Sequence, residues 1–244
     1  MARSLPVLIL QTGDAPEEVS QANGNYDRMF LAAAGLRPEQ AAVVHLPSGD
    51  RPQEPGAYGG VLITGSSAMV TDRLPWSEFA AGWLRQAMAE RVPIFGVCYG
   101  HQLLAYAMGG EVDYHPGGME LGTLDIELLP AAGQDPLLAS LTQGFPVNLI
   151  HSQTVLTPPP EAVVLARSQR DPHQILRYGE NTITVQFHPE FTAEVMHGFL
   201  RSMTEEQPER ELELARVGTG ISGTPQSRDL MATFVNRYIL RKGS

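Results

Sequence analysis

The sequence contains a single cysteine, Cys98, within residues 95–104 (FGVCYGHQLL). Glycines stand two positions before it and two positions after it, where an apolar strand-like run gives way to a helical pattern. A lone cysteine among apolar residues is more often part of a hydrophobic core. The two glycines favour a second interpretation, because a tight strand-to-helix turn needs residues without a Cβ and presents its central side chain above the sheet. We therefore treat Cys98 as a candidate nucleophile.

The expected position of Cys98 suits that chemistry. A helix predicted over residues 101–108 would begin just after the cysteine. The free N–H groups and the positive dipole end at a helix N-terminus favour a thiolate, which is the nucleophilic form of cysteine. The Tyr99 N–H would point at the oxyanion that forms when Cys98 attacks a carbonyl group.

A cysteine nucleophile needs a base, and His188 is the best candidate among the seven histidines. It follows a strand-like run in residues 186–190 (QFHPE), and strand ends are where ligands bind in α/β sheets. The carboxylate of Glu190 could hold the imidazole in the tautomer that accepts the thiol proton. The alternative is a surface histidine beside a turn proline. The presence of the cysteine turn favours the catalytic interpretation.

The elements that must position these residues follow an alternating pattern. Short apolar runs predict buried strands, helical spacing predicts helices between them, and strand-like segments with turns dominate the second half. This order predicts one domain with a mostly parallel sheet, helices on both faces and antiparallel additions. The expected strands are 6–10, 42–46, 61–64, 93–97, 123–129, 147–155, 162–166, 174–178 and 182–187, and the expected helices are 26–34, 77–91, 101–108, 193–214 and 227–241.

The motifs GVCYGHQLLA and VQFHPE together resemble the class I glutamine amidotransferase family, and they occur in that family's order. The resemblance covers about residues 5–199, which leaves 200–244 as a C-terminal helical extension of a single domain, 1–244. It implies a three-layer, flavodoxin-like α/β fold. It also implies that Cys98 is the nucleophile, His188 the base and acid, and Glu190 the carboxylate that orients the histidine.

The same resemblance implies roles for four further residues. The segment ITGSS (63–67) matches the family's glycine-rich turn, so the Gly65 N–H would be an oxyanion donor together with that of Tyr99. Gln102 would help to hold the amino-acid end of the substrate. Ser152, in IHSQ (150–153), would lie on the strand that contacts the same end.

The loop after Gly65, residues 66–76, has two interpretations. Asp72, Arg73 and Trp76 could line the pocket or form a lid. The alternative, which we favour, is an ordinary loop in which Trp76 anchors the next helix.

Composition limits the classes of partner. The net charge of −10 disfavours a protein that binds nucleic acid through the phosphate backbone. No stretch reaches the ~18 consecutive apolar residues of a membrane helix, and the N-terminal run lacks the form of a signal peptide. A single cysteine cannot form an internal disulfide, which fits a reducing compartment, and we expect a cytoplasmic protein.

Motifs for other chemistries are missing from the sequence. We find no phosphate-binding loop and no adenylating Ser-Gly-Gly-x-Asp-Ser loop, so we expect no synthase within this chain. The segment GTGISG (218–223) follows a charged, helix-like stretch and is expected to be a loop between two helices. His151, His173 and His188 have no metal-ligand spacing, and we expect no structural zinc and no cofactor.

The resemblance implies a substrate that is glutamine or another γ-glutamyl compound. The first hypothesis is a glutaminase that forms a γ-glutamyl thioester on Cys98 and releases ammonia and glutamate, and its partner would be a separate synthase subunit. The second is a free hydrolase of γ-glutamyl amides or peptides. The third is a binding or regulatory module without activity, which the presence of Cys98, His188 and Glu190 disfavours. The leaving-amine side of the pocket would discriminate between the first two.

Overall fold

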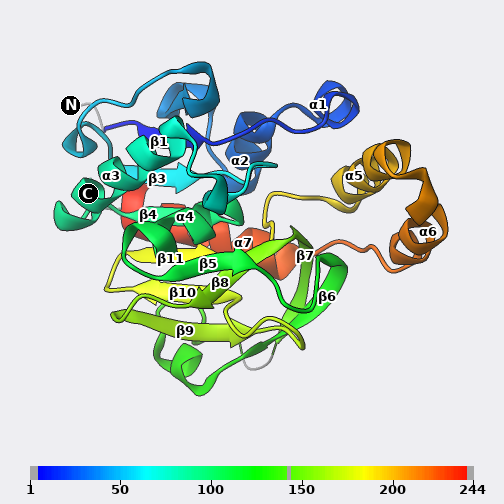
Figure 1. Cartoon of the computed structure of the whole chain (residues 1–244). Coiled ribbons are helices and arrows are strands. Elements are labelled where there is room, and N and C mark those ends of the chain that lie inside the picture. The colour runs from blue at the N-terminus through cyan, green and yellow to red at the C-terminus, as the bar shows by residue number, and fades with distance from the viewer. Residues whose placement is uncertain (1–4, 142–143, 241–244) are drawn as a thin grey trace.

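The computed structural model describes residues 5–141 and 144–240. Within these residues the central feature is a nine-stranded sheet with the order β2-β1-β3-β4-β11-β10-β9-β6-β7 (Figure 1). The five strands from β2 to β11 are mutually parallel, and the remaining neighbours pair antiparallel. This arrangement confirms the expected sheet, parallel with antiparallel additions.

The parallel strands are β1 (Val7–Gln11), β2 (Ala41–His45), β3 (Gly60–Ile63), β4 (Ile94–Val97) and β11 (Thr182–Val185). The antiparallel strands are β6 (Glu120–Leu128), β7 (Phe145–His151), β9 (Ala162–Arg167) and β10 (Ile175–Tyr178). A separate two-stranded sheet pairs β5 (Glu111–Tyr114) with β8 (Gln153–Thr157).

The helices are α1 (Glu17–Asn23), α2 (Tyr26–Ala34), α3 (Pro75–Ala89), α4 (Tyr99–Ala107), α5 (Ala193–Glu206), α6 (Glu211–Thr219) and α7 (Pro225–Phe234), and a π-helical turn continues α7 over Val235–Leu240. In the part of the chain that the structure describes, none of them combines the length and the apolar character that a bilayer-spanning helix requires.

Strand β1 explains why the sheet has helices on both faces. All of its residues are buried, and successive side chains of a strand point to opposite faces. Val7 and Ile9 pack in the apolar cluster that contains residues of α2 and α7. Leu8 and Leu10 pack in the cluster that contains residues of α3 and α4. The result is the expected three-layer α/β fold, with α5 and α6 beside the layers (Figure 1).

Two expected elements are divided in the structure. The strand expected over 147–155 is wrong, because β7 pairs with β6 up to His151 while β8 leaves to pair with β5. The helix expected over 193–214 is also wrong. Pro208 has no N–H and excludes the helical conformation for the residue before it, so α5 ends at Glu206 and α6 begins at Glu211.

Smaller differences concern the ends of elements and two short elements. Helix α4 begins at Tyr99, two residues earlier than expected. Strand β5 and helix α1 were not expected from the sequence. Residues 220–224 connect α6 to α7, so the segment 218–223 is a connection only from Gly220 onward, since Gly218 and Thr219 still belong to α6. In this connection the Ser222 N–H donates to Thr123 Oγ1 at 3.0 Å. Arg241, the last residue of the helix expected over 227–241, lies outside the described residues.

The C-terminal helix is part of the hydrophobic core. Phe234 is fully buried, and its ring packs edge-on against Phe95 of β4 with centroids 5.3 Å apart. Met231 and Ile239 belong to the same cluster. Helix α7 therefore supports the strand that leads directly to Cys98.

This packing predicts that Phe234→Ala lowers the free energy of unfolding by about 3–5 kcal/mol, since a buried ring is replaced by a cavity. Leu212→Ala is the matched control, because Leu212 on α6 is 79% exposed and its truncation should change stability by less than about 0.5 kcal/mol. Urea unfolding followed by circular dichroism measures both. Equal effects of the two substitutions would show that α7 does not support the core.

Candidate active site

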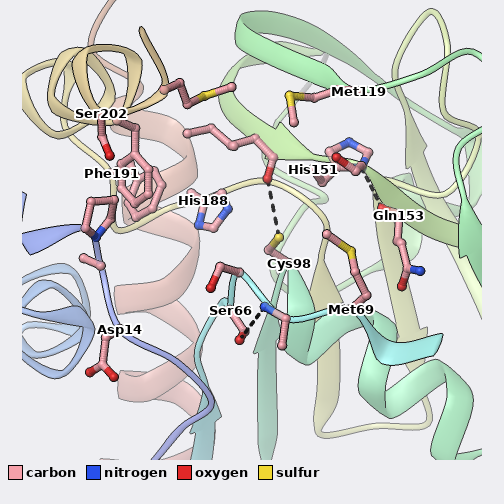
Figure 2. Close-up of a pocket in the computed structure, with 18 of the residues that line it drawn as sticks. Asp14, Ser66, Met69, Cys98, Met119, His151, Gln153, His188, Phe191 and Ser202 are labelled. Atoms are coloured by element: carbon pink, nitrogen blue, oxygen red, sulfur yellow. Dashed lines mark hydrogen bonds between the residues drawn. The ribbon is translucent and has the colours of Figure 1, made fainter. Parts of the chain in front are cut away.

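A cavity of about 380 Å³ opens at the carboxyl ends of the parallel strands. Its lining includes Asp14 from beyond β1, Ser66 from beyond β3, Cys98 directly after β4 and His188 from beyond β11 (Figure 2). Open α/β sheets bind their ligands at this edge. The cavity therefore lies where the fold predicts a site, and it contains the candidate nucleophile and the candidate base.

Cys98 occupies a constrained turn between β4 and α4. Its backbone has φ 49° and ψ −100°, a conformation that residues other than glycine rarely adopt. A Cβ on Gly96 would lie 2.8 Å from the Gly100 carbonyl oxygen, and a Cβ on Gly100 would lie 2.7 Å from the Ile63 Cβ. Both glycines are thus required by close backbone packing, as the sequence predicted.

The surroundings of Cys98 combine one acceptor with free N–H donors. The thiol donates to the Ile150 carbonyl at an Sγ to O distance of 3.7 Å, and the Cys98 N–H donates to the Val185 carbonyl at 2.9 Å. Within the described residues, the N–H groups of Gly65 and Tyr99 have no hydrogen-bond partner. Neither residue is itself part of the cavity lining, but each directly adjoins a lining residue, Ser66 and Cys98 respectively.

His188 is held in a fixed orientation. Its Nδ1 lies 2.8 Å from Glu190 Oε1, and both side chains are almost completely buried. The imidazole stacks on the Phe191 ring with centroids 4.0 Å apart and an interplanar angle of 6°. Because Nδ1 is committed to the carboxylate, Nε2 is the nitrogen that remains for chemistry.

The electrostatics of His188 favour its charged form. Burial alone would lower the pKa of His188, but the negative charges of Glu190 and Cys98 and the hydrogen bonds to them raise it to about 10. An imidazolium beside a thiolate is the arrangement that activates a cysteine nucleophile.

Gly65 borders both side chains. A Cβ at this position would lie 2.9 Å from His188 Cε1 and 3.7 Å from Cys98 Cβ. The turn after β3 thus approaches Cys98 and His188 so closely that only glycine fits at position 65. The Gly65 backbone therefore lies next to both side chains.

The two residues predicted to bind substrate, Gln102 and Ser152, both line the cavity. The Gln102 amide donates to the Gln153 carbonyl at 2.6 Å and to Gln186 Oε1 at 3.1 Å, so it also fixes the wall behind it. Ser152 lies at the turn between β7 and β8, and its carbonyl accepts from the His115 N–H at 2.8 Å.

Gln153 connects two walls of the cavity, a role that the sequence did not suggest. Its side chain accepts from the Val70 N–H at 3.0 Å and donates to Thr71 Oγ1 at 2.5 Å. The loop after β3 is thereby attached to the turn that carries Ser152. The motif IHSQ contains this residue, but only the tertiary structure identifies its partners.

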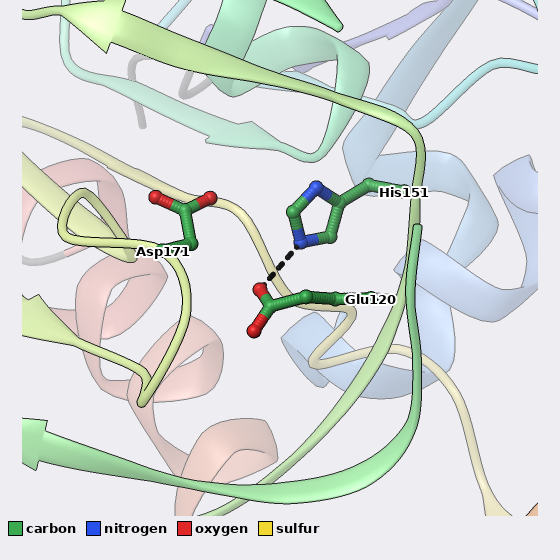
Figure 3. Close-up of side chains that lie close together, drawn as sticks. All are labelled: Glu120, His151 and Asp171. Carbon is green, nitrogen blue, oxygen red and sulfur yellow. Dashed lines mark hydrogen bonds and ion pairs between the residues drawn. The ribbon is translucent and has the colours of Figure 1, made fainter. Parts of the chain in front are cut away.

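A buried polar cluster lies behind the same wall (Figure 3). His151 Nε2 is 2.9 Å from Glu120 Oε2, and His151 Nδ1 is 2.9 Å from the Gln153 carbonyl. Ligand atoms of Glu120, His151 and Asp171 lie within 4.8 Å of one another, which is close enough for a metal site.

The carboxylates of this cluster already have protein donors. Glu120 accepts from Ser168 at 2.6 Å and from Gln174 at 2.9 Å, and Asp171 accepts from Thr154 at 2.5 Å. A cation would have to displace these contacts. We therefore interpret the cluster as a hydrogen-bond network that supports the wall of the cavity.

His101 lies close to Cys98 in sequence but takes no part in the cavity. It is fully buried, and its Nδ1 lies 2.8 Å from Thr184 Oγ1. Burial, together with the nearby His173 and His151, lowers the pKa of His101 to about 3, so it stays neutral.

Only the first part of the segment 66–76 contributes to the cavity. Residues 66–69 line the cavity, whereas Asp72, Arg73 and Trp76 lie outside its lining. Trp76 packs against the Tyr99 ring with centroids 5.5 Å apart. Trp76 is the second residue of α3, so this contact with the first residue of α4 agrees with the interpretation that Trp76 anchors the next helix.

Helix α5 supplies a wall that the sequence did not predict. Phe199, Ser202, Met203 and Glu206 line the cavity, and their spacing places them on one helical face. The amphipathic pattern was visible in the sequence, but periodicity does not reveal which surface a helix contacts.

Comparisons with known proteins agree with this architecture. The family model described as glutamine amidotransferase class-I matches residues 29–203, more than half of the chain. The chain is similar to a gamma-glutamyl-L-1-hydroxyisopropylamide hydrolase from Pseudomonas sp, with 35% identity over 154 residues. That alignment covers 60% of this chain and 52% of the hydrolase, so the chain spans about half the length of this relative.

Two further similarities complete the comparison. One of the subunits of a glutamine-hydrolyzing GMP synthase from Methanopyrus kandleri is 34% identical over 139 residues, which cover 54% of this chain and 66% of that protein. The crystal structure of a glutamine amidotransferase from Thermotoga maritima superimposes with a TM-score of 0.76. It has 16% sequence identity, and the match covers 97% of this chain and 99% of the other, which establishes the shared fold.

The buried network predicts a pH-dependent contribution to stability. Burial opposes the charge on Glu120, but hydrogen bonds from His151 and Ser168 hold its pKa below the ordinary 4.5. The stabilisation of the fold by the ionised Glu120 is therefore complete above about pH 4.5, and it is lost as the pH falls through the lowered pKa of this carboxyl group. Glu120→Gln should reduce the free energy of unfolding at pH 7 by about 3 kcal/mol, with a smaller difference in acid.

Glu127→Gln on the same strand is the matched control. Its carboxylate pairs with Arg167 but is 62% exposed, so the expected change is below about 1 kcal/mol. Urea unfolding at pH 7 and in acid measures both variants. If Glu120→Gln lowers the free energy of unfolding by the same amount at pH 7 and in acid, this account of the network is wrong.

Proposed function

Because the chain belongs to the class I glutamine amidotransferase family, we propose that it is a cysteine hydrolase that cleaves the amide bond of a γ-glutamyl compound. Cys98 is the nucleophile, His188 is the base and acid, and Glu190 orients the histidine. The observation that carries the proposal is the buried 2.8 Å bond from Glu190 to His188 Nδ1 in the cavity that contains Cys98.

In the first step the Cys98 thiolate attacks the γ-carbonyl carbon. The N–H groups of Gly65 and Tyr99, which have no partner among the described residues, hold the resulting oxyanion. One such donor is typically worth about 3 kcal/mol of transition-state stabilisation. The C–N bond then breaks while His188 Nε2 donates its proton to the departing nitrogen, which leaves a γ-glutamyl thioester on Cys98.

In the second step His188, now neutral, takes a proton from a water molecule that attacks the thioester. The C–S bond breaks, glutamate leaves, and the proton returns the site to its starting state. Glu190 remains ionised and stabilises the imidazolium in both steps. Gln102 and Ser152, which line the cavity, contact the amino-acid end of the substrate in this proposal.

The dimensions of the site favour a γ-glutamyl amide hydrolase. The cavity extends past His188 to helix α5, which leaves room for a leaving amine that is larger than ammonia. The similarity to a protein named as a γ-glutamyl-amide hydrolase supports this choice.

A second candidate function is glutamine hydrolysis that supplies ammonia to a separate synthase. Similarity to a protein named as one of the subunits of a GMP synthase supports it. The bond cleaved and the residues used are the same, so the two candidates differ only in the leaving amine and in the need for a partner. In either case we propose that the whole chain acts as one catalytic domain in the cytoplasm.

Removal of the thiol tests the nucleophile. Cys98→Ala should lower kcat/KM by roughly 10⁴-fold or more, because the residues of a nucleophile–base unit act together. The measurement is glutamate release from glutamine and from a γ-glutamyl dipeptide. The free energy of unfolding should stay within about 1 kcal/mol of the wild type, since the substitution is small. A folded and active Cys98→Ala protein would refute the assignment.

The alkaline limb of the pH profile tests His188. Its imidazolium must donate a proton, and its pKa is raised to about 10, so kcat/KM should fall as the pH rises through about 10. Glu190→Gln removes the main charge that raises this pKa and should move the limb to lower pH. The rate should also fall by roughly 10²- to 10⁴-fold. An unchanged limb in Glu190→Gln would exclude Glu190 as the partner of the histidine.

A further inference from the structure

The wall formed by helix α5 faces the part of the cavity where the leaving amine must be. Within the proposed function, His188 gives its proton to the departing nitrogen, so the amine departs on the imidazole's side of Cys98. In Figure 2, His188, Phe191 and Ser202 lie on one side of Cys98, and Met69, His151 and Gln153 lie on the other. The first side is therefore the amine side.

A continuous stack of rings connects His188 to α5. Phe191 packs on the imidazole at 4.0 Å and on Phe199 at 4.8 Å, measured between ring centroids. Phe199 and Met203 then give the amine side an apolar surface of the kind that packs against an alkyl chain. Ser202 adds a hydroxyl group next to them.

Apart from His188 itself, the charged side chains of the amine side are acidic. Asp14 and Glu206 line the cavity and are exposed to solvent. Asp14 has protein partners, because its Oδ2 lies 3.0 Å from His45 Nε2 and its Oδ1 accepts from the Gln11 amide at 3.1 Å. Glu206 forms no ion pair with any residue that the structure describes. A cation that enters along α5 would therefore meet an uncompensated carboxylate.

In the part of the chain that the structure describes, this wall has no cationic side chain that could pair with a carboxylate. Among the described residues, no lysine or arginine lines the cavity. Arg201 on α5 instead pairs with Glu18 of α1 at 3.2 Å. A leaving group with a terminal carboxylate, as in a γ-glutamyl peptide, would face the carboxylates of Asp14 and Glu206 with no lysine or arginine of the lining to pair with it.

We propose that the preferred substrate is a γ-glutamyl amide of an aliphatic amine that carries a second, cationic amino group at its far end. This proposal rests on the proposed function and specifies its substrate class. The γ-glutamyl carbon transfers to the Cys98 sulfur, the C–N bond breaks, and the diamine leaves with the His188 proton. Water then releases glutamate from the thioester.

Three substrates of equal chain length test the proposal: γ-glutamyl-1,4-diaminobutane, γ-glutamyl-4-aminobutyrate and γ-glutamyl-n-butylamide. Each has four carbons on the amide nitrogen, and they differ only at the fourth carbon, which is an aminomethyl group with its ammonium charge, a carboxylate or a methyl. We expect kcat/KM for the diamine conjugate to exceed that for the carboxylate by about tenfold and that for the butylamide by about threefold at low salt.

Charge reversal at one position provides the internal test. Glu206→Lys should reverse the order of the ammonium and carboxylate substrates, and Glu206→Gln should bring their kcat/KM values to within about threefold of each other. Glu205→Lys is the matched control, because Glu205 is the exposed neighbour on α5 that does not line the cavity. It should leave the wild-type order unchanged.

The outcomes separate this proposal from the proposed function. Cys98-dependent hydrolysis with equal rates for the three substrates, or with the carboxylate or the butylamide preferred, would refute the amine specificity alone. An order that responds equally to Glu206→Lys and Glu205→Lys would also refute the role of α5. If no γ-glutamyl amide and no glutamine is hydrolysed by the wild-type chain, the proposed function itself fails.

Discussion

The site depends on the close packing of one turn against its two neighbouring strands. Gly96 approaches the Gly100 backbone and Thr184 of β11, while Gly100 approaches Ile63 of β3. Neither glycine position has room for a Cβ, and this close packing allows the sharp turn between β4 and α4. Cys98, at the centre of that turn, has a positive φ of 49°. The surrounding core holds this strained residue in place, because β4 lies in the interior of the sheet with both faces covered.

The same packing sets the electrostatics. Burial removes water from His188 and Glu190, and this makes each charge interaction stronger than it would be at the surface. Glu190 uses only one oxygen in its contact with His188, and its other oxygen has no partner among the described residues. The His188 imidazole is thus the partner of that carboxylate, and the negative charge of Glu190 favours the ionised form of the imidazole.

The parts of the fold that could be predicted from the sequence are those with a local cause. The glycines around Cys98, the fully apolar β1 and the alternating strand and helix patterns each act within a few residues, so the three-layer architecture and the turn followed from them. The division of residues 147–155 into two strands at Ser152 could not be predicted, because it arises from the pairing of β7 with β6 and of β8 with β5. The contacts of Gln153 with the loop after β3 and the direction faced by Glu206 depend on packing between distant segments.

The position of α7 has a consequence for how the protein is divided experimentally. The family model ends at residue 203, and it begins at residue 29, after β1. A protein trimmed to those limits would lose the strand that pairs with both β2 and β3, and it would expose the face of β4 that Phe234 covers. The region that the family model matches is therefore smaller than the unit that must fold, and a shortened version of the protein has to keep both flanking segments.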